Sequence, residues 1–219
     1  MTFLATYKSQ GYVPRGLIAG NAALLISESI SLLAGNHARG TLLGRVTLGD
    51  ATSAAKAGGN TGNGVLTLDA TPRLDGAQAG VYAVTCTTAA ANGGTFTVVA
   101  QDGYALGTVA VGATFANQIK FSIADGSTDF IVGDSFNITV AAGLGGFVKS
   151  LSTANDGSQV PEAILAEDTD ATLEPAPTIA YTRGDFIADD VIFGAAHTVD
   201  STRAVLRDKG IFLIGQVPV

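Results

Sequence analysis

Few side chains in this sequence could carry out chemistry, and they are scattered along the chain. The only cysteine is Cys86, and the only histidines are His37 and His197. A zinc site needs three or four protein ligands. A nucleophilic thiol needs a histidine or a cation beside it to lower its pKa. The spacing of these three residues meets neither need, so the sequence predicts no zinc site and an unreactive Cys86.

Acidic residues offer a second kind of site. Two groups are candidates for calcium ligands: Asp125, Asp129 and Asp134 form one, and Glu167, Asp168 and Asp170 form the other. Neither group has the spacing of an EF-hand loop, and Asp and Gly are the ordinary residues of β-turns. We therefore interpret both groups as turn residues and keep calcium binding as the alternative.

Catalytic motifs give no stronger signal. Glu167 with Asp168 and Asp189 with Asp190 could be paired carboxylates, but the sequence does not place either pair around a substrate. The glycine-rich stretch at residues 58–64 lacks the Lys-Ser/Thr of a phosphate-binding loop. No G-x-S-x-G motif is present. The sequence therefore predicts a protein that is not an enzyme and needs no cofactor or metal.

The elements that would hold these residues are mostly strands. Between residues 65 and 140, apolar and polar residues alternate with a period of two, and Asn/Gly and Asp/Gly turns separate the runs. The alternation predicts inward-facing side chains in three runs: Tyr82, Val84 and Cys86; Ile119, Phe121 and Ile123; Phe136, Ile138 and Val140. This pattern predicts an antiparallel sandwich or barrel.

Two small, glycine-rich stretches flank this region, at residues 51–65 and 141–146, and we interpret them as linkers or loops. The flanking parts also show short strands. They contain one predicted helix, before Gly210, with Thr198 or Asp200 as its N-cap. The fold class is therefore mainly β: a body with one short helix, formed by residues 1–50 and 147–219, interrupted by an inserted domain at residues 51–146.

Charge is distributed unevenly. The net charge is −7, yet residues 1–45 are mildly basic and the remainder is acidic. An acidic body repels phosphate, which argues against nucleic-acid binding. Residues 16–35 fall short of a membrane span because polar residues interrupt the apolar run, and a strand plus a turn is the better interpretation.

Residues 1–20 show neither helical nor strand periodicity and are predicted to form an extended arm that orders on a binding partner. The arm residues predicted to make contact are Phe3, Leu4, Tyr7, Lys8, Tyr12, Val13 and Arg15. The apolar members would act as anchors and the basic members would face an acidic partner.

The flanking parts resemble the head decoration proteins of tailed bacteriophages, the lambda-like family. The residues that carry the resemblance are GTLLGRVTLGD at 40–50, PEAILAEDTDA at 161–171, TIAYTRGDFIADDVIFG at 178–194 and RAVLRDKGIFL at 203–213. The resemblance covers residues 1–50 and about 147–219. The intervening region resembles the immunoglobulin-like or β-sandwich modules that phage structural proteins often display.

The resemblance implies a structural virion protein on the outer surface of the capsid. Its partners would be the major capsid protein and itself, as a homotrimer at three-fold positions, with no nucleic acid and no membrane involved. The alternative function is a carbohydrate-binding or adhesive β-module on a tail or cell surface. That function would require exposed aromatic rings, whereas the chain has no Trp and the region from Tyr82 to Phe136 places most of its seven aromatic residues on the predicted inner face.

Overall fold

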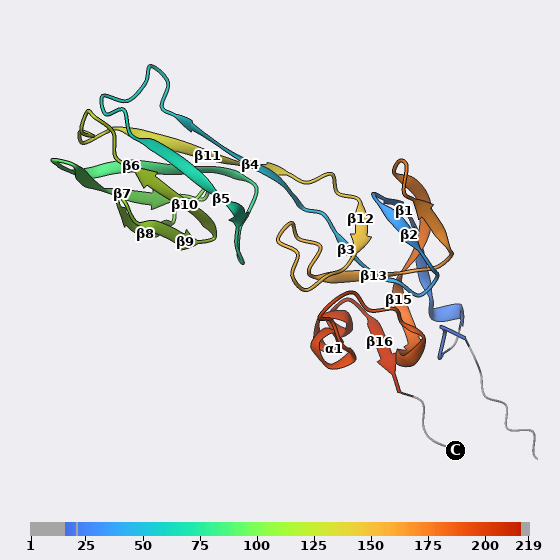
Figure 1. Cartoon of the computed structure of the whole chain (residues 1–219). Helices are drawn as coiled ribbons and strands as arrows, with labels where there is room; N and C mark the ends of the chain where they lie inside the picture. Colours follow the sequence, from blue (N-terminus) through green and yellow to red (C-terminus); the bar gives the residue numbers. More distant parts are fainter. Residues whose placement is uncertain (1–15, 21, 216–219) are drawn as a thin grey trace, which may run out of the picture.

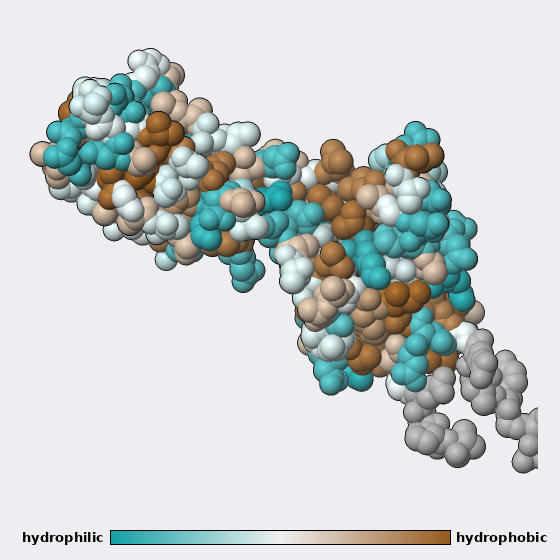
Figure 2. All heavy atoms as spheres, in the orientation of Figure 1, coloured by the Kyte–Doolittle hydropathy of each residue, from teal (hydrophilic) through white to brown (hydrophobic). Residues whose placement is uncertain are grey.

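The computed structural model describes residues 16–20 and 22–215 of the 219-residue chain. Two β-rich regions are joined by a narrow neck (Figures 1 and 2). We call them the body, residues 16–47 and 147–215, and the distal region, residues 48–142. The fold is mainly β with one α-helix in the described part of the chain, as the sequence predicts.

The body is built around a small closed sheet. Its elements are η1 (Ala22–Leu24), β1 (Ile26–Leu32), β2 (Gly35–His37), β3 (Leu42–Arg45), β12 (Phe147–Lys149), β13 (Pro161–Leu165), β14 (Thr169–Ala171), β15 (Ala176–Ile187), η2 (Ala188–Asp190), α1 (Val199–Asp208) and β16 (Ile211–Ile214). Five strands follow the order β1-β12-β3-β13-β15, and an antiparallel pairing of β1 with β15 closes the ring. Strand β16 adds to β15 in parallel, and β14 pairs with β2 in a separate two-stranded sheet.

The helix of the body has the boundaries that its sequence predicts. The Thr198 side chain accepts a hydrogen bond from the backbone N–H of Ser201, and the Ser201 side chain accepts one from the Thr198 backbone. Thr198 is therefore the N-cap, while Asp200 lies in the first turn, where a carboxylate favours the helix dipole. Leu206 is buried in the body core, and Gly210 takes a left-handed conformation (φ 80°) just past the helix end.

The distal region consists of two antiparallel sheets. Its strands are β4 (Leu48–Ala55), β5 (Val65–Arg73), β6 (Gly80–Ala90), β7 (Gly93–Val99), β8 (Ala105–Ala110), β9 (Thr114–Asn117), β10 (Ile119–Ala124) and β11 (Ser135–Ala142). One sheet has the order β4-β11-β6-β7-β8 and the other has the order β5-β10-β9. Side chains from both sheets share one hydrophobic core. The nine residues predicted to point inward in three of these strands are all buried, which confirms the predicted alternation.

One local prediction is wrong. Residues 51–55 belong to strand β4 rather than to a linker, because they pair with β11 in register from Ala51 to Ala55. The sequence did not indicate this strand because its residues are Ala, Thr and Ser, which give no alternation of apolar and polar side chains. Such small residues fit an edge strand beside β11, whose inward side chains are large. Strand β4 thus crosses the predicted boundary at residue 50, and the limits of an inserted domain stay a prediction.

The neck consists of two closely spaced chain segments. The N–H of Val46 donates to the Gly146 carbonyl, and the N–H of Gly143 donates to the Thr47 carbonyl, both at 2.9 Å. A Cβ atom on Gly143 would lie 2.5 Å from the Val46 carbonyl oxygen, so only glycine permits this approach.

A side chain also connects the two regions. Arg73, at the end of β5, donates from Nη1 to the carbonyls of Leu48 and Gly49 and from Nη2 to Asn155 Oδ1 of the body. Asn155 Nδ2 donates back to the Arg73 carbonyl at 3.2 Å. The distal region is therefore attached to the body by a side-chain contact as well as by the two neck segments.

Candidate docking surface

The arm residues predicted to bind a partner lie outside the described part of the chain. They are Phe3, Leu4, Tyr7, Lys8, Tyr12, Val13 and Arg15. The structure does describe residues 16–20, the last part of the predicted arm. The candidate docking surface is therefore built from this segment and the elements around it.

The arm root is fixed to the body by backbone pairing. Leu17 is buried in the body core, and its carbonyl accepts a hydrogen bond from Ile187 N–H at 2.9 Å. Ile18 forms an antiparallel bridge with Phe186, and Ala19 N–H donates to the Asp185 carbonyl at 2.9 Å. Residues 17–19 thus add a short segment to the end of β15, so this part of the predicted arm, residues 1–20, packs on the body.

The C-terminal strand flanks the same part of β15. Ile187 of β15 has Ile214 of β16 as its register partner. The backbone N–H of the same Ile187 donates to the Leu17 carbonyl. The described N-terminal and C-terminal ends therefore emerge together. They lie at the end of the body that is farthest from the distal region (Figure 1).

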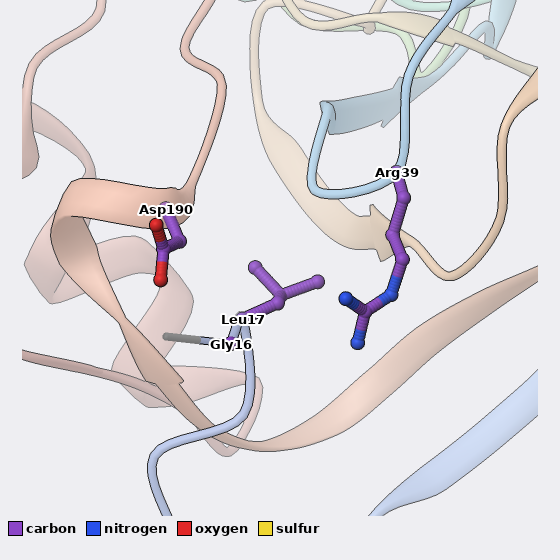
Figure 3. Close-up of a pocket in the computed structure, with 4 residues that line it drawn as sticks. All are labelled: Gly16, Leu17, Arg39 and Asp190. Atoms are coloured by element: carbon purple, nitrogen blue, oxygen red, sulfur yellow. The ribbon is translucent and has the colours of Figure 1, made fainter. Parts of the chain in front are cut away.

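A shallow pocket lies beside the arm root. It has a volume of about 300 Å³ and is lined by Gly16, Leu17, Arg39 and Asp190. Arg39 and Asp190 extend on either side of Leu17 (Figure 3). The backbone N–H of Arg39 donates to Asp168 Oδ1 at 2.7 Å, and this bond holds the loop that carries Arg39 in place. The pocket places one cation and one carboxylate beside Gly16, the first described residue.

Exposed apolar side chains lie on the strand that flanks this root. They are Phe212 and Ile214 of β16, 41% and 43% exposed. Strand β16 is an edge strand and presents both on its outer face. Apolar groups on an unpaired edge are typical of an interaction surface.

Charged side chains of both signs lie at this end of the body. Asp185 and Asp190 lie near residues 16–20, where Arg39 lines the same pocket, and Arg203 Nη1 donates to the Leu213 carbonyl of β16 at 3.4 Å. The basic residues Lys8 and Arg15 that make the front segment positive lie outside the described residues. The described part of this end therefore carries acidic and basic side chains together.

The candidate chemical groups occupy structural positions. Cys86 is fully buried, and burial, followed by the nearby Asp134 carboxylate, raises the pKa of its thiol. A raised pKa keeps the thiol protonated at neutral pH, so Cys86 behaves as a small core residue.

Sequence reasoning missed one pair of residues with catalytic character. His197 Nε2 lies 3.1 Å from Ser150 Oγ, although 47 positions separate them and no local motif links them. The Ser150 hydroxyl donates its proton to the Ser158 carbonyl at 2.7 Å, so it accepts from the histidine. Ser150 is also fully buried, and burial lowers the pKa of His197. The contact supports the fold and has the wrong proton direction for an activated nucleophile.

Asp134, a member of one candidate calcium group, is fully engaged by protein donors. It accepts hydrogen bonds from the backbone N–H groups of Thr61, Gly62 and Ile131, at 2.9, 2.9 and 3.1 Å, and from Lys56 Nζ at 3.0 Å. Burial alone would raise the pKa of Asp134, but these donors together hold it far below its usual range. The carboxylate thus fixes the glycine-rich loop at residues 58–64.

The carboxylates of the second acidic group also accept hydrogen bonds from the protein. Asp168 accepts from Arg39 N–H, Asp170 accepts from the backbone and hydroxyl of Thr172, and Glu167 accepts from Thr178 Oγ1 at 3.3 Å. Among the described residues, no three His, Cys, Asp or Glu side chains gather as a metal site. No helix in the described part is long and apolar enough to cross a membrane.

A carbohydrate-binding module, the alternative function, would need exposed aromatic side chains. Of the seven aromatic side chains from Tyr82 to Phe136, six are buried and only Tyr104 is exposed, at 69%. A single exposed ring provides no stacking platform for a sugar polymer.

Comparison with known families identifies the relatives of the chain. Residues 89–211 match the family described as Bacteriophage lambda head decoration protein D. The chain belongs to this family. Its members are structural head proteins rather than enzymes. The match covers residues 147–211, which confirms the resemblance in that part of the chain. It also covers residues 89–146, which belong to the predicted insert. Residues 1–50 lie outside the match.

Other comparisons add little. No curated protein matches the chain. Two crystal forms of Xanthomonas campestris FlgL match at 24% sequence identity, with TM-scores of 0.33 and 0.32, over 48% of this chain. The chain spans about a third of the FlgL chains, since 33% of each is covered. Such TM-scores support no conclusion about this protein.

Proposed function

We propose that this head decoration protein binds the outer surface of a phage capsid and stabilises the shell. Its partners would be the major capsid protein and two further copies of itself, as a trimer at the three-fold positions. The family match supports capsid decoration, and the absence of an organised chemical site in the described residues is in keeping with a function based on adhesion.

The orientation on the shell rests on one observation. Both described chain ends and strand β16, with its exposed Phe212 and Ile214, lie at the end of the body opposite the distal region. We propose that this end faces the shell and that the distal region projects away from it.

The arm provides the grip in this proposal. Its apolar residues, from Phe3 to Val13, and its two cations, Lys8 and Arg15, would contact the shell by adding a strand to an exposed sheet edge. Ordering the chain costs roughly 1–2 kcal/mol per residue. The fixed root at residues 17–19 limits that cost to the arm itself, and trimerisation would combine three weak contacts into one strong attachment.

Residues 51–146 would form an inserted module that is dispensable for docking. The shared core of the two distal sheets supports this proposal, as does the close approach of Val46 to Gly146 and of Thr47 to Gly143 in the neck. An insertion whose ends lie close together adds little loop-closure entropy to the host fold.

The test is binding to empty heads of the phage, measured as copies bound per head. Removing residues 2–15 should abolish binding while oligomeric state and melting temperature stay nearly unchanged. Replacing residues 51–146 by a short linker should leave a folded body, by circular dichroism, that still binds heads. If the arm-less protein decorated heads as tightly as the intact chain, the docking surface would lie elsewhere. An unfolded excision product would show that the two regions depend on each other.

A further inference from the structure

The body and the distal region have separate cores. Among the described residues, no hydrophobic cluster contains side chains of both regions. Regions that share no large apolar interface are expected to move relative to each other. A ribbon of only two chain segments is marginally stable, so the neck by itself would act as a hinge. A fixed orientation of the distal region therefore needs a further support.

The loop between β12 and β13, residues 150–160, reaches from the body to the neck. The carbonyl of Asp156 in this loop accepts hydrogen bonds from the backbone N–H groups of both Thr47 and Leu48, each at 2.8 Å. Thr47 Oγ1 donates to the same carbonyl at 3.4 Å. Thr47 is the last residue of the body before β4, and Leu48 is the first residue of that strand. The β12–β13 loop is thus bonded to the chain at the boundary of the two regions.

The same loop also contacts a second distal strand. Asn155 exchanges two hydrogen bonds with Arg73, the last residue of β5: Arg73 Nη2 donates to Asn155 Oδ1 at 3.3 Å, and Asn155 Nδ2 donates to the Arg73 carbonyl at 3.2 Å. The β12–β13 loop therefore bonds to both β4 and β5. Contacts with two strands resist a rotation of the distal region that a contact with one strand would allow.

The β12–β13 loop is itself fixed to the interior of the body. Ser158 is 2% exposed, and its carbonyl accepts a hydrogen bond from Ser150 Oγ at 2.7 Å. The Asp156 carboxylate accepts from the backbone N–H and the hydroxyl of Ser158, at 3.0 and 2.6 Å. Ser150 in turn lies 3.1 Å from His197 Nε2. The contact of His197 with Ser150 thus supports the base of the loop that holds the neck.

Glycine at position 157 allows the loop to lie directly on the neck. Gly157 has a φ of 98°, and a Cβ atom at this position would overlap Thr47 Oγ1. A side chain there would push the loop and the neck apart. Gly103, in the distal loop between β7 and β8, is also left-handed, with a φ of 85°, but a Cβ atom there would meet no described atom within 4 Å. The two glycines therefore separate backbone strain from contact with the neck.

We propose that the β12–β13 loop holds the distal region in one orientation relative to the body, so that the two regions move as a single rigid unit. On a decorated head, a setting that rests on the proposed function, the body would then determine the direction in which the distal region projects. The orientation is a property of the chain itself and is tested without a shell.

The experiment measures residual dipolar couplings of the backbone amides in the full chain, fitted separately for the body and the distal region. Regions held rigidly share one alignment tensor, whereas regions joined by a hinge give two. Gly157→Ala inserts a methyl group between the loop and the neck, and Gly103→Ala adds the same group to a left-handed glycine away from the neck. Asn155→Ala removes the contact to Arg73 without adding atoms.

We expect one tensor to fit both regions of the intact protein and of Gly103→Ala. Gly157→Ala should require two tensors, and Asn155→Ala should reduce the couplings of the distal region relative to those of the body. Two tensors in the intact protein, one tensor in a folded Gly157→Ala, or equal behaviour of the two glycine variants would overturn the proposal.

Circular dichroism and the amide spectrum show whether each variant is folded. If Gly157→Ala does not fold, Asn155→Ala decides the matter, because an unchanged single tensor in that variant would overturn the proposal. Failure to bind heads with the orientation intact would instead count against the proposed function alone.

Discussion

The body and the distal region are both β structures, but they are stabilised differently. The distal region has one continuous core that contains six buried aromatic rings, with Phe96 packed edge-on against Phe130 at 5.0 Å between ring centroids. The body has two smaller clusters of mostly aliphatic residues on a closed ring of strands. Aromatic burial supplies much stabilising area from few residues.

The two regions also differ in how far apart in the sequence their paired strands lie. Strand β1 of the body pairs with β15, about 150 residues later in the chain. In the distal region β6, β7 and β8 are neighbours in sequence and in the sheet. Local pairing closes short loops at small entropic cost, whereas the body must close long ones. The distal region also pairs β4 with β11, about 80–95 residues later, so its longest closure is shorter than that of the body.

The body links β13 to β3 and to the end of α1 through one acidic residue. Glu162 of β13 accepts from Arg45 of β3 at 3.2 Å and from Lys209 after α1 at 3.0 Å. The Arg45 guanidinium also lies 4.9 Å from the centre of the Phe147 ring. These contacts are partly exposed, and pairs of this kind contribute at most about 1 kcal/mol each. The distal region has ion pairs of its own, Lys56 with Asp134 and Lys120 with Asp69, so the two regions differ mainly in the composition of their cores.

The sharpest test of this comparison is to damage one core at a time. Phe96→Ala should cost about 3–5 kcal/mol of unfolding free energy, because it leaves a cavity among aromatic rings. Leu42→Ala, at a fully buried position of the body, should cost about 2–5 kcal/mol. Calorimetry should show that each variant lowers one transition and leaves the other in place. A single transition lowered by both variants would mean that the two regions unfold as one unit.

Asp134 offers a test that affects the distal region alone. Its pKa in the folded protein is far below the ordinary value of about 3.9. Its contribution to stability is therefore fully present above about pH 4 and is lost as the pH falls below that value, when the unfolded chain takes up the proton. The Lys56 side chain is 34% exposed, so the cost of losing the charge comes mainly from the backbone donors of Thr61, Gly62 and Ile131, at about 1–3 kcal/mol for each donor left without its acceptor.

Asp134→Asn should lower the stability of the distal region at pH 7 and flatten its dependence on pH between about 4 and 2. Chemical denaturation followed by near-UV circular dichroism at a series of pH values measures both effects. Asp69→Asn, which removes an exposed ion-pair partner, is the matched control and should cost at most about 1 kcal/mol. A pH dependence as steep in Asp134→Asn as in the intact protein would assign the effect to other carboxylates.

Arg73 tests the connection between the regions, and its expected effect on stability is the smallest. Arg73→Ala removes the contacts to Leu48, Gly49 and Asn155, each worth about 1 kcal/mol. We expect both cores to remain intact and the orientation of the distal region to vary more. Spin labels placed on the outer strands of the two regions should give a broader distance distribution. Lys120→Ala, away from the neck, should leave that distribution unchanged, and an unchanged distribution in Arg73→Ala would show that the neck alone sets the orientation.

Local patterns predicted the strands of the distal region well. Alternation placed Tyr82, Val84 and Cys86 on the inner face because a strand exposes every second residue to the core, and the structure agrees. Thr198 and Gly210 predicted both ends of α1 for a similarly local reason, since capping involves residues within one turn. Membership in the head decoration family also follows from short motifs whose order can be recognised along the chain.

Tertiary structure decided what local patterns do not encode. The closure of the body by β1 and β15, the strand at residues 51–55, the contact of His197 with Ser150 and the loop held by Asp134 all join residues distant in sequence. Each depends on which long-range partner is available once the chain is compact, and composition carries no record of that partner. The position of the arm root beside the C-terminal strand has the same origin. It is set by β15, whose Ile187 N–H donates to the Leu17 carbonyl and whose end pairs with Ile214 of β16.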